Sequence, residues 1–152
     1  MAYITPKTDW AVRIVSGVYT GDFFNASDYN RIVGNILYVA ELAETIYEID
    51  LPLVSMRDMY PTSIPYAEDF NALELNIQTI CAAVTTPASW TGQKTWYANG
   101  TVPLVADWNR WEATIRDLKN RVEYDARWTG FVTADDELFI TADDKQFKVL
   151  EA

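Results

Sequence analysis

The chain reads Asp28-Tyr29-Asn30-Arg31-Ile32, then Asp69-Phe70-Asn71-Ala72-Leu73, then Asp107-Trp108-Asn109-Arg110-Trp111. Each copy begins with an acid, an aromatic residue and an asparagine, and apolar residues follow four, eight and eleven places after the acid. Successive copies lie 41 and 38 residues apart. A motif that recurs at such a period indicates one structural unit used three times.

The apolar positions of each copy form the stripe of an amphipathic helix. Positions one, four, eight and eleven after the acid share one face when the chain turns every 3.6 residues. We expect helices over about residues 26–48, 66–84 and 104–124. Three helices with one apolar stripe each bury those stripes most simply in a three-helix bundle, so the sequence predicts a mainly α fold.

The acid of each motif falls near the start of its predicted helix. Free backbone N–H groups and the helix dipole favour a carboxylate there. Asn25 stands three residues before Asp28, a spacing typical of an N-cap residue paired with an acid. Pro65 and Pro103 mark the entries to the second and third helices.

The asparagine of each motif, at positions 30, 71 and 109, is not explained by helix propensity, because asparagine is a middling helix former. One interpretation is that each side-chain amide hydrogen-bonds the loop entering its helix, or a neighbouring helix. The alternative is a ring of amides around a shared ligand. We favour the structural interpretation, because buried polar groups mostly pair with backbone.

Two long connections separate the predicted helices. Residues 51–65 contain three prolines and predict an irregular link. Residues 85–103 contain Trp90, Trp96 and Tyr97, which are our candidate binding residues. These side chains could fold back as a lid on the core or form an exposed contact patch. We favour the lid, because large exposed apolar patches are rare on monomers.

Short strands are expected at both ends. Residues 12–22 mix β-branched residues with glycines, which indicates a strand pair or an arm with a turn at Ser16-Gly17. At the C-terminus, Phe131, Phe139 and Phe147 begin strand-like segments that repeat every eight residues and are separated by acidic turns. This pattern predicts a short antiparallel β meander, with the three phenylalanines as candidate interface residues. Calcium at the acidic turns is an alternative, but the spacing does not match an EF-hand loop.

The predicted organisation has three parts. They are an N-terminal arm over residues 1–25, a three-helix domain over 26–127 that includes the aromatic loop 85–103, and a C-terminal meander over 128–152.

The composition excludes several classes of function. The formal net charge is −10 and no basic run occurs, so nucleic acid and anionic membranes are poor partners. No apolar run is long enough to span a bilayer, and the N-terminus lacks the pattern of a signal peptide, so we expect synthesis in the cytoplasm. Cys81 is the single cysteine and there is no histidine, which argues against structural zinc and the usual catalytic triads, and we expect no metal or cofactor. We expect no enzymatic activity.

Several stretches together resemble a known family. They are Pro6-Lys7-Thr8-Asp9-Trp10, Asp22-Phe23-Phe24-Asn25, the three acid-aromatic-asparagine motifs, and the terminal Thr-Ala-Asp-Asp and Lys-Gln-Phe-Lys-Val segments. Over most of its length the chain resembles small virion proteins of tailed bacteriophages and prophages of Firmicutes, particularly clostridial ones. The segment from Ala11 to Gly21 departs from the resemblance, because a shorter link is expected there.

The resemblance implies a tail, baseplate or fibre-associated component and carries over no catalytic residue. We therefore hypothesise a non-enzymatic virion structural protein that forms a homo-oligomer and binds other virion proteins. A capsid decoration or head-fibre protein is an alternative. A carbohydrate- or cell-wall-binding module that recognises a host cell-surface glycan through the aromatic loop is another.

Overall fold

A computed structural model describes residues 2–127, 131–132, 138–141 and 147–150. Its helices are α1 (Ala26–Tyr47), α2 (Ala67–Ala83) and α3 (Val105–Arg127). Its strands are β1 (Ile14–Val15), β2 (Val18–Tyr19), β3 (Phe131–Val132), β4 (Leu138–Thr141) and β5 (Phe147–Leu150). The three helices lie within three residues of the bounds expected from the apolar stripes, which confirms the mainly α character.

Each helix begins where the acid of its motif can accept a hydrogen bond from the chain just before it. At the start of α1, the Asn25 side chain accepts hydrogen bonds from the N–H groups of Ser27 and Asp28, and Asp28 accepts one from the Asn25 N–H at 3.1 Å. Asp69 and Asp107 accept the equivalent bonds from the residues three places before them, at 2.7 and 3.0 Å. The carboxylates therefore satisfy backbone donors that a helix start leaves unpaired.

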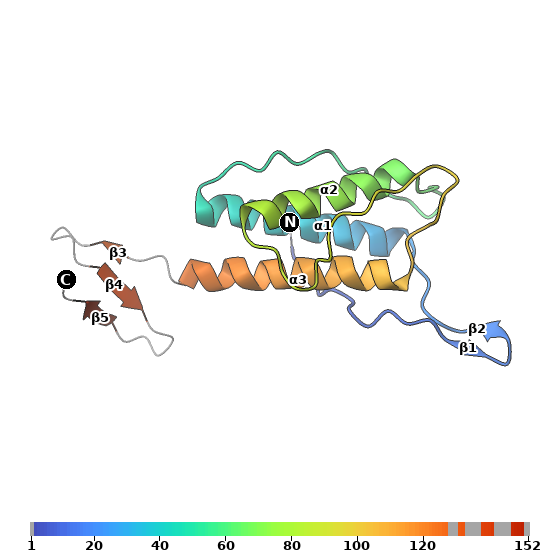
Figure 1. Cartoon of the computed structure of the whole chain (residues 1–152), viewed down its shortest axis with the longest axis horizontal. Helices are drawn as coiled ribbons and strands as arrows, with labels where there is room; N and C mark the ends of the chain where they lie inside the picture. Colours follow the sequence, from blue (N-terminus) through green and yellow to red (C-terminus); the bar gives the residue numbers. More distant parts are fainter. Residues whose placement is uncertain (1, 128–130, 133–137, 142–146, 151–152) are drawn as a thin grey trace.

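All three helices run in the same direction (Figure 1). Two contacts agree with this direction: the rings of Tyr29 and Phe70, each one place after its acid, lie 6.5 Å apart, and the Tyr47 hydroxyl near the end of α1 bonds Asp125 near the end of α3. A helix of 22 residues is about 33 Å long, so an extended return needs at least ~10 residues. The long connections are therefore return crossings, and we call residues 48–66 and 84–104 the straps.

The apolar stripes meet in the centre of the bundle. The rings of Phe70 and Trp111 stack there at 6.0 Å between centroids. At least 92% of each stripe side chain is buried, and these residues are Tyr29, Ile32, Ile36, Val39, Phe70, Leu73, Ile77, Ile80, Trp111, Ile115 and Leu118. Trp108 is the exception, because it packs against Trp10 and Phe24 outside the central stripe. The predicted stripes thus form the core.

Side chains from the straps and the arm cover the remaining sides of the helices. Trp90 and Trp96 keep only 5% and 8% of their surfaces exposed, and Trp10 keeps 4%. Met59 and Leu51 of the first strap are buried as well. The lid interpretation of the aromatic loop therefore holds for both of its tryptophans.

A β hairpin precedes the helices. Strands β1 and β2 pair antiparallel, with Ile14 opposite Tyr19 and Val15 opposite Val18. The two turn residues, Ser16 and Gly17, both have positive φ, at 50° and 78°. Two consecutive positive φ angles indicate a type I′ turn, whose twist suits a two-residue hairpin.

The predicted fold class, three helices followed by a C-terminal meander, was wrong. A two-stranded antiparallel sheet of β1 and β2 precedes the three helices, and the predicted fold class does not include it. Each strand has only two residues and no buried face, so no alternating apolar pattern signals it.

The chain after α3 is described only as separate strand segments. Strands β3, β4 and β5 pair antiparallel in that order, with Phe131 opposite Phe139 and Thr141 opposite Phe147. The acidic turns that a meander requires fall on residues 133–137 and 142–146, which lie outside the described residues. The side chains of these strands lie outside them as well.

Ile77→Asp tests the core. Ile77 is fully buried, so an unpaired carboxylate there costs several kcal/mol and should unfold the bundle. Thermal unfolding followed by circular dichroism measures this. Leu75→Asp is the matched control, because Leu75 lies on the same helix with 40% of its surface exposed and should retain most of its melting temperature. A folded Ile77→Asp variant with an unchanged melting temperature would contradict the assigned core.

Candidate functional site

The three motif asparagines each hold the backbone of one residue in a strap or in the arm. The amide of Asn30 accepts a hydrogen bond from the Met59 N–H at 2.8 Å and donates one to the Met59 carbonyl at 2.7 Å. Asn71 holds Trp96 in the same way, at 2.7 and 2.9 Å. The third amide, Asn109, holds Trp10 with two bonds of 2.9 Å. We call this two-bond arrangement an amide clamp.

Two further clamps lie on α1 and α2, further toward the C-terminal ends of these helices. Asn35 holds Ile4 at 2.9 and 2.7 Å, and Asn76 holds Val54 with two bonds of 2.8 Å. Both stand seven places after their acids. The equivalent residue of α3 is Thr114, whose buried hydroxyl has no hydrogen-bond partner within the part of the chain that the structure describes. The spacing of seven residues from each acid is the signal in the sequence that marks these positions.

In the alternative interpretation, the three asparagine amides would bind a shared ligand. The clamps already occupy these amides. In each motif asparagine, both the oxygen and the nitrogen are already bonded to backbone. One detail differs from our expectation. Asn30 and Asn71 hold the strap that leaves their helix, rather than the strap that enters it, because the straps run back beside the helices.

The motif acids are paired with cations. Asp28 meets Arg31 of its own helix at 2.8 Å, whereas Asp69 meets Arg57 of the preceding strap at 2.6 Å. Asp107 similarly meets Lys94 of the second strap. The Arg57 guanidinium, aided by a backbone N–H, holds the pKa of Asp69 below its usual value. The acids therefore tie the straps to the helix starts.

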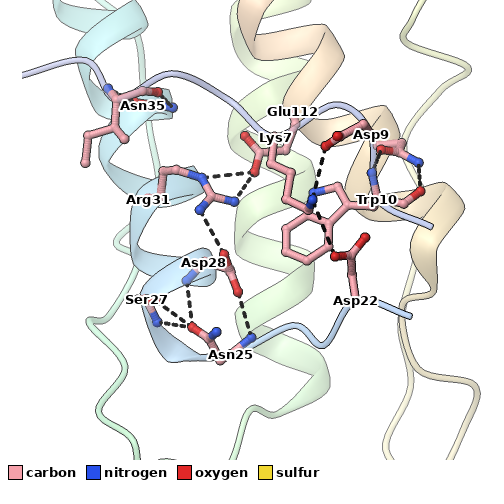
Figure 2. A network of polar contacts seen from close by, with 12 residues as sticks. Lys7, Asp9, Trp10, Asp22, Asn25, Ser27, Asp28, Arg31, Asn35 and Glu112 are labelled. Carbon is pink, nitrogen blue, oxygen red and sulfur yellow. Dashed lines mark hydrogen bonds and ion pairs between the residues drawn. The ribbon is translucent and has the colours of Figure 1, made fainter. Parts of the chain in front are cut away.

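Two fully buried carboxylates lie between the helices. Glu112 accepts hydrogen bonds from Arg31, which also reaches Asp28, so one guanidinium joins two acids (Figure 2). Glu74 accepts bonds from Arg110 and from the Trp111 indole N–H at 2.8 Å. Burial raises the pKa of Glu112, and Arg31 opposes that rise.

These buried acids are structural. Each is held by a cation, and neither lines the groove described below. Removing one partner from such a pair leaves an uncompensated charge in the core, so the pairs fix which helices meet.

The described residues offer neither a cluster of metal ligands nor a reactive thiol. Within residues 2–127 and the described strands, no group of three or more histidine, cysteine, aspartate or glutamate side chains is placed to hold a metal ion. Burial raises the pKa of Cys81 to about 12, so its thiol stays protonated.

None of the described helices is both long and apolar enough to cross a membrane.

The candidate binding residues of the aromatic loop do not form one surface. The Trp90 indole N–H donates to Gln78 at 2.8 Å, and the Arg110 guanidinium lies 4.6 Å from the centre of its ring. Trp96 is buried against Phe70. Tyr97 has 72% of its surface exposed and is the single candidate of the three that a partner can reach.

The accessible apolar side chains gather in the three segments that lead into the helices. We call residues 11–25, 60–66 and 97–104 together the entry face. Its exposed large apolar residues are Val12, Ile14, Val15, Val18, Tyr19, Phe23, Tyr60, Ile64, Tyr66, Tyr97, Val102 and Leu104. The parallel helices bring all three segments to the same end of the bundle (Figure 1).

Two shared hollows and one ring contact place these segments close together. Residues 24–27 and 59–65 line one hollow, and residues 65–71 and 96–103 line a groove of about 740 Å³. Phe24 of the first segment stacks on Trp108, in the first turn of α3, at 5.0 Å. The three segments are therefore neighbours around one end of the molecule.

The entry face carries almost no charge. Residues 60–66 and 97–104 contain no charged residue, and residues 11–25 contain only Arg13 and Asp22. Asp22 is itself paired with Lys7 (Figure 2). In a chain of net charge −10, such a face is unusual.

The candidate interface residues Phe131, Phe139 and Phe147 lie on β3, β4 and β5. Their side chains fall outside the described residues, so this interface stays a prediction.

Comparisons with protein-family models, with curated proteins and with solved structures give no match to this chain.

Asn71→Ala tests the clamps. It leaves the partly buried N–H and carbonyl of Trp96 without their partner, which should lower the free energy of unfolding by about 1–3 kcal/mol. Chemical denaturation measures the loss. Asn120→Ala, at an exposed position of α3, is the matched control and should change stability little. Equal stability of the two variants would show that the clamp contributes nothing.

Arg57→Met tests the pairing of strap and helix start. Because Asp69 has a lowered pKa in the folded state, the pair stabilises the fold above the unfolded pKa of about 4 and loses this effect as the pH falls through the folded pKa. The variant should therefore be less stable than the wild type at pH 7, and the difference should shrink at pH 3. Thermal unfolding at both pH values measures it. Arg13→Met is the exposed control and should show a smaller difference, because Arg13 forms no ion pair among the described residues and is the smallest of the causes that lower the pKa of Asp22.

Proposed function

We propose that the chain is a non-enzymatic structural component of a virion that binds other proteins through its entry face. The entry face is the observation that supports this proposal. Monomeric proteins rarely expose large apolar patches unless these serve an interaction, and the entry face holds twelve exposed large apolar residues at one end of the bundle. Depletion of charge is also typical of the core of protein interfaces.

The construction of the face supports the same proposal. The amide clamps fix Met59 and Trp96 to the helices, close to where the exposed segments begin. Trp10 is fixed in the same manner just before residues 11–25. A surface held in place before it meets a partner loses less conformational entropy on binding, which favours affinity.

The described polar residues support a role other than catalysis. The buried acids are held by arginines, and the motif amides are held by backbone. These groups are thereby committed to holding the scaffold together, whereas the accessible surface at the entry face offers apolar contact.

The virion part of the proposal rests on the resemblance in sequence to virion proteins of tailed bacteriophages and prophages. A tail, baseplate or fibre-associated position follows from that resemblance. A sugar-binding role has weaker support, because stacking on a sugar ring needs accessible aromatic faces and Trp90 and Trp96 are buried.

Mass spectrometry of purified particles tests this function. If the chain is a structural component, particles from a producing host should contain it in many copies. Particles complemented with a Tyr97→Glu variant should contain much less of it, because a charge on the entry face opposes docking. Leu75→Glu adds the same charge outside the face and should leave incorporation unchanged. Purified particles that lack the wild-type chain would refute the proposal.

A further inference from the structure

The hairpin is uncovered on both sides. Side chains alternate between the faces of a strand, so Ile14 and Tyr19 share one face and Val15 and Val18 share the other. Ile14 is 65% exposed, Val15 is 55% exposed and Val18 is 63% exposed. A two-stranded hairpin is marginally stable alone, and this one has apolar side chains in water on both faces. The apolar composition of the hairpin is therefore typical of a strand pair that another protein surface covers.

A groove at the same end of the molecule offers a matching surface. It lies between residues 65–71 and 96–103, with the exposed rings of Tyr66 and Tyr97 among its lining. Residues 97–103, which form most of one wall, carry no charge, and the opposite wall contributes one exposed carboxylate, that of Glu68. An apolar strand or hairpin fits such a lining better than a charged segment does.

We propose that the entry face is the interface of a homodimer, in which the hairpin of each copy covers the groove of the other. This inference rests on the proposed function as an assembly component and names the partner as a second copy of the chain.

Charge favours a second copy as the partner. At a net charge of −10, two copies repel each other wherever their acidic surfaces meet. The entry face, with one arginine and one aspartate, is the exposed region where they can approach with little repulsion. A basic partner would instead be attracted to the acidic surfaces of the chain, so an uncharged binding face would give it no electrostatic advantage.

The available area also suits a dimer. A stable interface buries roughly 800 Å² on each partner. Phe23, Tyr60, Tyr66 and Tyr97 are each more than half exposed, and buried aromatic side chains contribute roughly 150–250 Å² apiece. The exposed parts of these four rings would supply at least about half of the required area, and the aliphatic residues of the hairpin add to it.

The placement of hairpin and groove allows a closed assembly. A two-fold interface uses one patch twice, so that a residue i of one copy meets residue j of the other and the reverse. Because both elements belong to the entry face, one two-fold axis can satisfy both contacts at once. The assembly then stops at two copies.

Light scattering on the full chain and two charge variants tests this arrangement. The wild type should have twice the 17.3 kDa mass of one chain. Val18→Glu and Tyr97→Lys each place a charge in the contact and should give monomers, and the glutamate at position 18 would also meet the carboxylate of Glu68 in the groove. An equimolar mixture of the two should recover the dimer mass, because the new lysine of one copy then meets the new glutamate of the other. Leu75→Glu should stay dimeric.

Several results would overturn the dimer. They are a wild type that is monomeric at high micromolar concentration, a dimer that neither substitution weakens, or single monomers whose mixture does not associate. Unchanged melting temperatures of both variants would show that loss of mass reflects the interface rather than unfolding. The dimer and the virion role can fail separately: a monomer found in purified particles overturns only the dimer, and a dimer missing from particles overturns only the virion role.

Discussion

The amide clamp is the interaction on which the rest of the structure depends. A strap that crosses beside a helix has no strand partner, so its N–H and carbonyl groups would be left without hydrogen bonds where side chains shut out water. An asparagine amide supplies one donor and one acceptor in the plane where a neighbouring strand would offer them. The clamps on Met59, Trp96 and Trp10 let each crossing lie close against the bundle and bury its apolar side chains.

Ion pairs hold the straps and helices together in addition to the amide clamps. Each motif acid accepts a backbone hydrogen bond at its helix start and also meets a cation, which for Asp69 and Asp107 comes from a strap. The helix dipole favours the carboxylate at the same place. Deeper in the bundle, Arg31 and Arg110 neutralise Glu112 and Glu74 across helix boundaries. Charge in this molecule thus specifies which elements lie together.

The parallel course of the helices links the fold to the proposed function. In an antiparallel bundle, the segments before successive helices would lie at alternating ends. Here they lie at one end (Figure 1), so the exposed apolar residues of 11–25, 60–66 and 97–104 gather there. The straps that make this course possible also hold the surface in place.

The sequence by itself determined the local structure. The stripe from Tyr29 to Val39 and its two copies predicted the helices, because helical periodicity depends on residues three and four apart. It also predicted acids at the helix starts and asparagines bonded to backbone. The tertiary structure alone decided the direction of the helices. It also decided between alternatives that the sequence left open, such as the burial of Trp90 and Trp96 and the strand pair within residues 12–22. The reason is distance along the chain: Asn109 holds a residue 99 positions away, and no local pattern encodes such a partner.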